Sequence, residues 1–396
     1  MKNHWVIRVV AAAFAGLLVF QAWGAAPAEQ TKKEDPIPDE IRSKGKEAID
    51  RGLRYLRSQQ DKDGSWRHHT GITALALKAF ASSPRKYREK DGPWMRKPVE
   101  FILAAQQKSG GIYTRELPNY NTAVAVWALA SLENPKYKPV LDKAQKFLLG
   151  LQLDESQGYE PGKDIMYGGA GYGGDERPDM SNSSFWAAAM KATDLPEDDP
   201  AWKKMVEFVS KCQQSSATNP LKKMDVKLEH PIGNDGGALY YPDYSSVGTV
   251  KLPDGRVVWR SYGSMTYAMI MSFLYARVDP KDPRVVAAVD WVKKNYTLDE
   301  NPGAGAQGLY YYYYTFAKAM RAYGEPTITD AAGATHNWRV DLIEKLASLQ
   351  REDGSWVNTN KRWWENDPVL CTAYAVLALN EALVEPEKTA PEPGAR

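Results

Sequence analysis

Apolar positions along this chain fall into one register that returns six times. In RGLRYLRSQQDKDGSW, residues 51–66, a basic residue, a small residue, an aromatic–aliphatic pair and a glutamine stand at fixed spacing. Five of the six copies keep the glutamine: Gln60, Gln106, Gln152, Gln213 and Gln350. The fifth copy has Tyr296 at that position. Apolar residues spaced three and four apart predict amphipathic helices, and a fixed period predicts a repeat architecture.

Each copy continues through a loop of turn-forming residues into a second, alanine-rich segment. One hydroxyl residue aligns in each of these segments: Thr73, Thr122, Ser184, Thr266, Thr315 and Thr372. Small residues follow it within a few positions, so these segments predict helices that pack closely on their neighbours. The unit is therefore helix, loop, helix, and its six copies span about residues 48–382. No long alternating run predicts a sheet.

A helical pair of this kind cannot bury its apolar face alone, so it must stack on the next pair. An open stack needs polar caps at both ends, whereas a closed ring does not. The first and sixth copies both carry DGSW, at residues 63–66 and 353–356, and are ordinary members rather than caps. The pattern therefore predicts an all-α ring of six helix–loop–helix repeats over residues 46–384.

The first 24 residues have the order typical of a secretory signal peptide. Two basic residues precede the apolar run 9–20, and small residues lead up to Gly24, after which we expect cleavage. That run is too short to span a bilayer comfortably, and no later segment is long and apolar enough. We therefore expect a protein exported to the periplasm or the extracellular space, without a membrane anchor. Charge and proline predict a flexible lead-in at residues 25–45 and a disordered tail at residues 385–396.

Charge and cysteine content exclude some functions. Lysine and arginine number 51 against 49 for aspartate and glutamate, so no net field favours nucleic acid or an anionic membrane as a partner. Cys212 and Cys371 are too few for a disulfide framework, and the sequence leaves open whether they pair or stay free thiols. The 13 tryptophans and 22 tyrosines suit ligand cavities as well as cores, because each joins an apolar body to a polar tip.

The first copy matches the QW motif of the squalene and oxidosqualene cyclases at Arg51, Gly52, Tyr55, Leu56, Gln60, Gly64 and Trp66. The six-copy stretch resembles the terpenoid cyclase and protein prenyltransferase superfamily, most specifically in the first and sixth copies. The resemblance implies an (α/α)6 toroid, in which the second helices form an inner ring around a central cavity and the first helices form an outer ring. It also implies that the residues of the QW motif are structural: Gln60, Asp63, Trp66, Gln350, Asp353 and Trp356.

The catalytic acids of that family are where this chain departs from the resemblance. Squalene cyclases start their reaction with DxDDTA and the oxidosqualene enzymes with DCTA, in which an aspartate protonates an alkene or an epoxide. Residues 369–373 read VLCTA and lack that aspartate. The zinc ligands of the prenyltransferases are also missing, since Asp367, Cys371 and His336 do not match their spacing. We therefore expect neither a metal nor a cofactor.

The inner helices should all begin on one face of the ring, and the residues around these helix starts predict a ligand-binding rim. The candidates are His68, His69, Tyr120, Asn121, Tyr172, Arg177, Asn182, Arg260, Tyr262, Trp363 and Trp364. The longest insertions, in the third and fourth copies, also fall there, and insertions in a repeat array often mark the binding face. Six helix starts together with Arg260 would favour an anion. The Asn, Ser and Asp residues of the rim equally fit ordinary helix caps.

Five consecutive tyrosines, residues 310–314, begin the fifth inner helix. Successive helical residues turn by about 100°, so the five rings must point all round the axis. We expect some of them to pack against the outer ring and others to face the cavity. We assign Tyr312 and Tyr313 to the cavity wall.

Three functions stay open, and the first is preferred. The ring could bind an apolar or elongated, isoprenoid-like ligand in an aromatic cavity, without chemistry. It could instead be an isoprenoid cyclase or transferase that uses Asp179 and Asp367 as acids, with aromatic walls that stabilise cations. Third, it could act on a polysaccharide, as a lyase with a Tyr or His base or as a hydrolase with the same two aspartates as its carboxylate pair. The sequence does not decide whether the protein is an enzyme.

Overall fold

The ring is seen in a computed structural model that describes residues 37–173 and 177–384. All of these residues belong to one compact unit. The segments expected to be a signal peptide and a C-terminal tail lie outside the described residues. The first helix begins at Asp39, within the stretch 25–45 that the sequence suggests as a lead-in.

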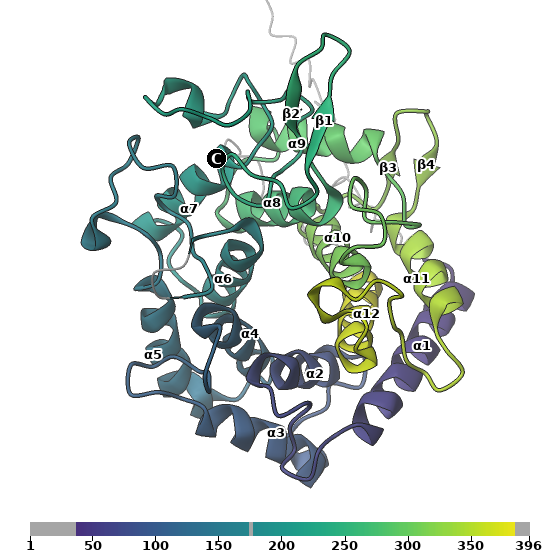
Figure 1. The fold of residues 1–396 in the computed structure, drawn as a ribbon. Helices are drawn as coiled ribbons and strands as arrows, with labels where there is room; N and C mark the ends of the chain where they lie inside the picture. Colours follow the sequence, from purple (N-terminus) through teal and green to yellow (C-terminus); the bar gives the residue numbers. More distant parts are fainter. Residues whose placement is uncertain (1–36, 174–176, 385–396) are drawn as a thin grey trace, which may run out of the picture. The chain divides into compact units, whose positions relative to one another are not determined.

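Twelve α-helices of the described residues alternate between an outer and an inner ring (Figure 1). The outer helices are α1 (Asp39–Ser58), α3 (Pro93–Ala104), α5 (Lys138–Leu149), α7 (Pro200–Lys211), α9 (Pro283–Lys294) and α11 (Trp338–Leu349). The inner helices are α2 (Thr70–Ser82), α4 (Pro118–Ala130), α6 (Met180–Ala192), α8 (Gly263–Tyr275), α10 (Leu309–Tyr323) and α12 (Pro368–Leu383). Two small hairpins lie in loops: β1 (Thr249–Lys251) with β2 (Val257–Trp259), and β3 (Ile328–Thr329) with β4 (Thr335–His336).

The inner ring is closed. Each inner helix packs on the next along the chain, and α12 packs on α2 (Figure 1). Outside this seam, α1 packs on both α11 and α12. The predicted (α/α)6 toroid of six helix–loop–helix repeats is therefore confirmed. No helix among the described residues has the length and apolar character needed to cross a membrane.

Burial of the helices follows their composition. The inner helix α2, TGITALALKAFAS, is small or apolar on nearly every side and is buried on nearly every side. An outer helix buries only one stripe, which in α3 consists of Met95, Pro98, Val99 and Ile102 at spacings of three and four. The main hydrophobic core therefore lies between the two rings.

The repeated glutamine joins one repeat to the next. Gln60 donates from Nε2 to the glycine carbonyl of its own loop and to the carbonyl of Trp94 in α3, both at 2.9 Å. Gln350 makes the same pair of contacts, and its partner in the next repeat is Ala48 of α1, at 2.9 Å. The contact that links the first repeat to the second thus also links the sixth to the first, which explains why the terminal repeats need no polar caps.

Tyr296, which replaces the glutamine in the fifth repeat, still reaches the next outer helix. Its hydroxyl donates to Oδ2 of Asp341 in α11 at 2.8 Å. The longer tyrosine therefore bonds to a side chain where the glutamines bond to a backbone carbonyl. The fifth repeat is therefore also tied to the next outer helix at this position of the register, through a different hydrogen bond.

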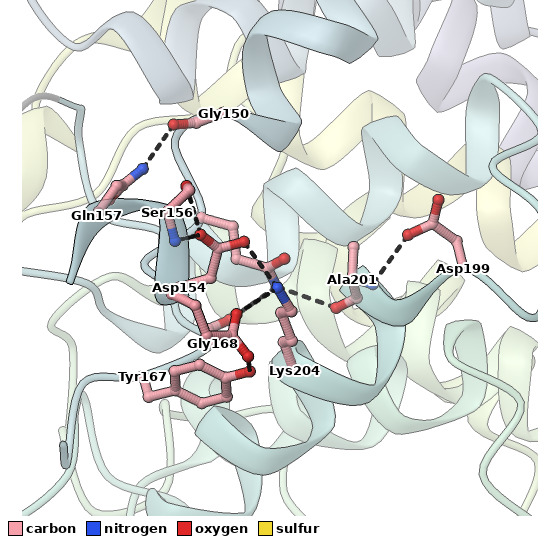
Figure 2. A network of polar contacts seen from close by, with 11 residues as sticks. Gly150, Asp154, Ser156, Gln157, Tyr167, Gly168, Asp199, Ala201 and Lys204 are labelled. Atoms are coloured by element: carbon pink, nitrogen blue, oxygen red, sulfur yellow. Dashed lines mark hydrogen bonds and ion pairs between the residues drawn. The ribbon is translucent and has the colours of Figure 1, made fainter. Parts of the chain in front are cut away.

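The basic residue of the register binds the loop of the preceding repeat. Lys97 donates to the carbonyl of Lys62 at 2.7 Å, and Arg51 donates to the carbonyl of Arg351 at 2.7 Å across the seam. Figure 2 shows the fourth copy, in which the Lys204 ammonium lies 2.8 Å from Asp154. These three contacts hold their loops against the neighbouring outer helices.

The tryptophans of the two DGSW sequences close the loops of their own repeats. Trp66 donates from Nε1 to the carbonyl of Leu56 at 2.7 Å, and its backbone N–H donates to the hydroxyl of Thr73 at 3.0 Å. Trp356 makes the equivalent two contacts in the sixth repeat. Gly64 has a φ of 90°, and a side chain there would collide with Lys97, so only glycine fits.

Four of the aligned hydroxyls accept a loop N–H group in this way: Thr73, Thr122, Thr266 and Thr372. Thr122 accepts from Ile112 at 2.8 Å in the second repeat. In the third repeat the acceptor is Ser183, bonded to Ala170 at 3.1 Å, whereas the hydroxyl of Ser184 donates back into its own helix. The alignment on Ser184 is therefore wrong by one residue, because both positions offer the same hydroxyl to a sequence comparison.

Candidate functional site

The N-terminal ends of the inner helices surround a cavity of about 310 Å³. This volume falls within the usual size of small-molecule sites. Each inner helix contributes an aromatic side chain at or near its start: His69, Tyr120, Phe185, Tyr262, Tyr311 and Tyr374. Loops add four more rings, from Tyr172, Tyr240, Trp363 and Trp364. The cavity thus lies on the rim that the sequence predicts, and its wall is largely aromatic.

Aromatic packing continues from the wall into the ring beneath it. The Phe185 ring lies 5.1 Å from that of Tyr120, edge to face, and is stacked on Tyr314 at 6.1 Å. Tyr314 is also stacked on Tyr374 at 5.6 Å and lies 5.7 Å from Trp127. Contacting aromatic rings hold one another in place beyond what their buried area alone provides. The wall of the cavity is therefore backed by a continuous cluster of packed aromatic rings.

The five tyrosines of α10 divide differently from the sequence-based assignment. Tyr311 lines the cavity, and Tyr314 packs just below it. Tyr312 and Tyr313 are fully buried, and their hydroxyls donate to the carbonyls of Thr297 and Leu298 at 2.6 and 2.7 Å. They face the loop between α9 and α10, so their placement in the cavity wall is wrong. Helical period fixes the angles between the rings but not the rotation of the helix about its own axis.

Seven of the predicted ligand-binding residues line the cavity: His69, Tyr120, Tyr172, Asn182, Tyr262, Trp363 and Trp364. Four others lie outside its lining. His68 is exposed and bonds to Asp63, and Asn121 is buried and donates to the carbonyl of Glu116. Arg177 covers the ring of Tyr241 at 4.0 Å, and Arg260 is exposed.

His68 belongs to a small acidic group on the surface. The ligand atoms of Asp61, Asp63 and His68 lie within 4.8 Å of one another, and the Nδ1 of His68 is 2.9 Å from Asp63. The pKa of His68 is raised, mainly by its hydrogen bond to Asp63. Exposed acidic groups often cluster in this way without an ion, so the arrangement alone assigns no metal.

Two tryptophans stand at the mouth of the cavity in a tight turn. Trp363 and Trp364 have φ values of 54° and 63°, a left-handed conformation that is uncommon for bulky residues. Trp364 is 60% exposed, and its ring meets that of His69 edge to face at 5.9 Å. Trp363 lies against Gly308, where a side chain would crowd its ring. The turn therefore holds two large apolar side chains partly in water beside an apolar cavity.

Glu365 is the one acidic residue of the cavity lining, and sequence reasoning misses it. It lines the cavity with 1% of its surface exposed. Its carboxylate accepts from the backbone N–H groups of Tyr310 and Tyr311, at 3.2 and 2.8 Å, and from Nδ2 of Asn358 at 2.7 Å. Burial raises its pKa, while these donors oppose the rise. The group caps α10 from a loop more than fifty residues later, so no local pattern announces it; only its position beside two tryptophans could draw attention.

No protein-family model matches this chain. Lanosterol synthase erg7A of Aspergillus fumigatus is 30% identical over a stretch that covers 29% of this chain and 17% of that protein. A variant of the type II terpene cyclase MstE from Scytonema matches 88% of this chain and 99% of its own, with a TM-score of 0.54 at 13% identity. The fold is that of the terpenoid cyclases.

The terpenoid cyclase-like toroid is shared with proteins of other chemistry. The GH76A α-1,6-mannanase of Salegentibacter matches 85% of this chain and 98% of its own, with a TM-score of 0.53 at 12% identity. One MstE structure holds geranylgeranyl dihydroxybenzoate as its substrate, and one mannanase structure holds α-1,6-mannotetrose. Likeness at these identities establishes the fold, and the function must be argued from the cavity.

Asp179, the first candidate acid, is buried just outside the cavity lining. It caps α6 by accepting from the backbone N–H of Asn182 at 2.8 Å, and its second oxygen accepts from Nδ2 of the same residue at 2.8 Å. Complete burial raises its pKa to about 6. Asp179 itself is not part of the cavity lining, whereas Asn182 is. The Asn182 side chain therefore intervenes between this carboxyl group and any ligand.

Asp367, the second candidate acid, is occupied elsewhere. Arg67 donates from two nitrogens to its two oxygens, both at 2.9 Å, and the backbone N–H of Val369 donates to it at 2.8 Å. It caps α12, which lies across the inner ring from α6, since two inner helices separate them in either direction. Asp179 and Asp367 are therefore not brought together as a carboxylate pair.

Proposed function

We propose that this protein binds an apolar, isoprenoid-like small molecule in its aromatic cavity and does not start a cyclisation by protonation. The support is the placement of three carboxyl groups among the described residues, of which only Glu365 lines the cavity. Both oxygens of Glu365 accept backbone or amide N–H groups, which favours the ionised form. Asp179 stands behind Asn182, and Asp367 is paired with Arg67. An aromatic cavity in which no acid donates a proton to the ligand suits a binding protein better than a protonation-initiated cyclase.

The apolar character of the expected ligand follows from the cavity wall. Phenols of the wall bond to other hydroxyl groups of the protein, as Tyr311 does with Ser181 at 2.9 Å and Tyr120 with Tyr374 at 3.4 Å. Burial raises the pKa of Tyr120 to about 12, so the rings are neutral at physiological pH. A ligand that covers these rings gains mainly by removing apolar surface from water. A sugar, whose many hydroxyls each need a partner, gains less from this wall.

A cavity-filling variant tests this proposal. Leu370 lines the cavity, so Leu370→Trp should place an indole in it and weaken farnesol binding by about tenfold or more, since each factor of ten needs only about 1.4 kcal/mol. Leu349→Trp is the matched control, because Leu349 is exposed at the end of α11. Isothermal titration calorimetry measures both affinities, and circular dichroism checks the fold. Equal binding by both variants would place the ligand elsewhere.

One observation favours an enzyme as the second candidate. A buried aspartate with a pKa of about 6 keeps its proton to a higher pH than an exposed aspartate does, which is the direction a general acid needs. Asp179 could deliver that proton only if Asn182 moved aside. Incubation with squalene followed by mass spectrometry of the products, for wild type and Asp179→Asn, separates the two candidates. A cyclised product that disappears in the variant would replace the binding proposal.

Export belongs to the same proposal. Residues 1–24 lie outside the described residues, and only their sequence supports a signal peptide cleaved after Gly24. Isoprenoid diphosphates are made in the cytoplasm, so an exported toroid would meet finished apolar molecules rather than these precursors. The intact mass of the protein purified from the cell exterior would show whether the first 24 residues have been removed.

A further inference from the structure

The charge facing the cavity is negative. Among the described residues that line it, Glu365 is the only carboxylic acid, and no lysine or arginine takes part. His69 uses Nδ1 to accept from the backbone N–H groups of Gly71 and Ile72, at 3.1 and 3.3 Å. Burial lowers its pKa, so its ring is neutral at pH 7. An anionic group placed here would meet a carboxylate at low dielectric without a counter-charge.

The helix starts around the cavity are already satisfied. Sequence reasoning expects six positive dipole ends to favour an anion, but each start has an acceptor from the protein. The acceptors on α2, α4, α6, α8, α10 and α12 are, in that order, His69, the carbonyl of Tyr172, Asp179, Asn301, Glu365 and Asp367. Three of these six caps are carboxylates. The expectation of an anion is therefore wrong, because the protein supplies the anions itself.

One buried acceptor in the cavity lining has no partner. Asn182 is only 2% exposed, and its Oδ1 lacks a hydrogen-bond partner among the described residues. Its Nδ2 donates to Asp179 at 2.8 Å. An ionised carboxylate can only accept, so it fixes which end of the amide turns toward it. Oδ1 is thereby left for a donor that the described protein does not provide.

We propose that the polar end of the bound molecule is a hydrogen-bond donor, a hydroxyl or an ammonium group, which bonds to Oδ1 of Asn182. Because Glu365 and Oδ1 of Asn182 are both acceptors, the cavity binds a molecule with the same hydrocarbon chain more weakly when that chain ends in a carboxylate or a phosphate. This inference rests on the proposed function and specifies the ligand class of that site. The tyrosine and serine hydroxyls of the lining do not determine whether the ligand donates or accepts, since a hydroxyl can do either.

Three probes test this directly on the whole protein. Farnesol, farnesylamine and farnesoic acid carry the same hydrocarbon chain with different polar ends. At pH 7.5 we expect farnesol, farnesylamine or both to bind wild type about tenfold or more tighter than farnesoic acid, by isothermal titration calorimetry. The tighter of the two donors tells a hydroxyl from an ammonium. Equal or tighter binding of the acid overturns the inference while the proposed function stands; no binding of any probe defeats both.

A matched pair of variants assigns the effect to Asn182. Asn182→Leu should weaken the preferred donor ligand by about tenfold and leave farnesoic acid almost unchanged. Asn121→Leu is the control, because Asn121 is also buried at an inner helix start with an unpartnered Oδ1 but lies outside the cavity lining. Equal losses in the two variants, or equal losses for alcohol and acid in Asn182→Leu, overturn the assignment. The wild-type series stands independently if either variant fails to fold.

Discussion

Asp179 links folding to ligand recognition at the scale of single residues. It is fully buried, it caps α6, and it orients the amide of Asn182. The positive charge of Arg177 favours its ionised form, but this effect is smaller than that of burial. Burial therefore makes the ionised form of Asp179 unfavourable. We infer that the residue is kept because it orients the amide of Asn182.

Replacement of Asp179 should change how stability depends on pH. A pKa raised from 3.8 to about 6 means that the folded state holds a proton between these pH values while the unfolded state does not. The free energy of unfolding therefore falls as pH rises through this window, by at most about 3 kcal/mol. Asp179→Asn should remove that fall. Urea unfolding of both proteins between pH 4 and 7 measures it.

Other groups near Asp179 could mimic this effect only if they titrated in the same window. The titratable or charged groups that face it or sense its charge are Arg177, Tyr172, Tyr240, Tyr262, Tyr311 and Cys212. The tyrosines and the cysteine have pKa values raised by burial, so they stay neutral there. Parallel pH profiles for wild type and variant would show that burial does not raise the pKa of Asp179, and would contradict this prediction.

Glu365 and the free Oδ1 of Asn182 lie beyond sequence reasoning for a physical reason. Each owes its role to partners remote in sequence or to the ionisation of a neighbour. Glu365 caps a helix that begins more than fifty residues before it. Asn182 resembles any other first-turn asparagine until the structure shows that its Nδ2 is held by Asp179 and that its Oδ1 is not.

At the scale of elements, α10 shows what sets the rotation of an inner helix. The hydroxyls of Tyr312 and Tyr313 bond to the loop before the helix, and Glu365 holds its start from the other side. These contacts turn Tyr311 toward the cavity. The run of five tyrosines therefore serves the core, the cavity wall and the packing beneath the cavity at once.

Two single-atom deletions in α10 test this division. Tyr312→Phe removes a buried donor from the carbonyl of Thr297, so it should lower the free energy of unfolding by about 1–3 kcal/mol and leave ligand affinity unchanged. Tyr311→Phe should cost less stability and alter ligand affinity instead, because its hydroxyl lines the cavity with Ser181. Urea unfolding and calorimetric titration measure the two effects. The reverse pattern would return Tyr312 to the cavity wall.

The helices themselves could be predicted from sequence because their signals are local. Apolar spacing, alanine-rich inner segments and the glutamine register each occupy a few residues, and the structure confirms the two-ring order they indicate. The alignment of Ser184 fails by one position because Ser183 and Ser184 are chemically alike. Tyr296 keeps its place although its chemistry differs, since it still reaches α11.

At the scale of the whole ring, closure depends on repeating one set of contacts at the seam. Gln350 reaches Ala48 and Arg51 reaches Arg351, as their counterparts do between consecutive repeats. Because both terminal repeats carry the full register, closure could be predicted without knowing any helix position. The ring gathers six helix starts at one end, where three carboxylates cap them and leave a cavity of aromatic rings with negative charge.

Native mass spectrometry of the protein purified from the host that exports it tests the central claim most directly. We predict a bound apolar small molecule that organic extraction recovers as an uncharged alcohol or as an amine, and that is absent from Leu370→Trp. Such a molecule would fit the proposal that the cavity holds an apolar ligand whose donor end meets Oδ1 of Asn182. Protein that is empty, that fails to bind farnesol and that degrades an acidic polysaccharide would contradict the account.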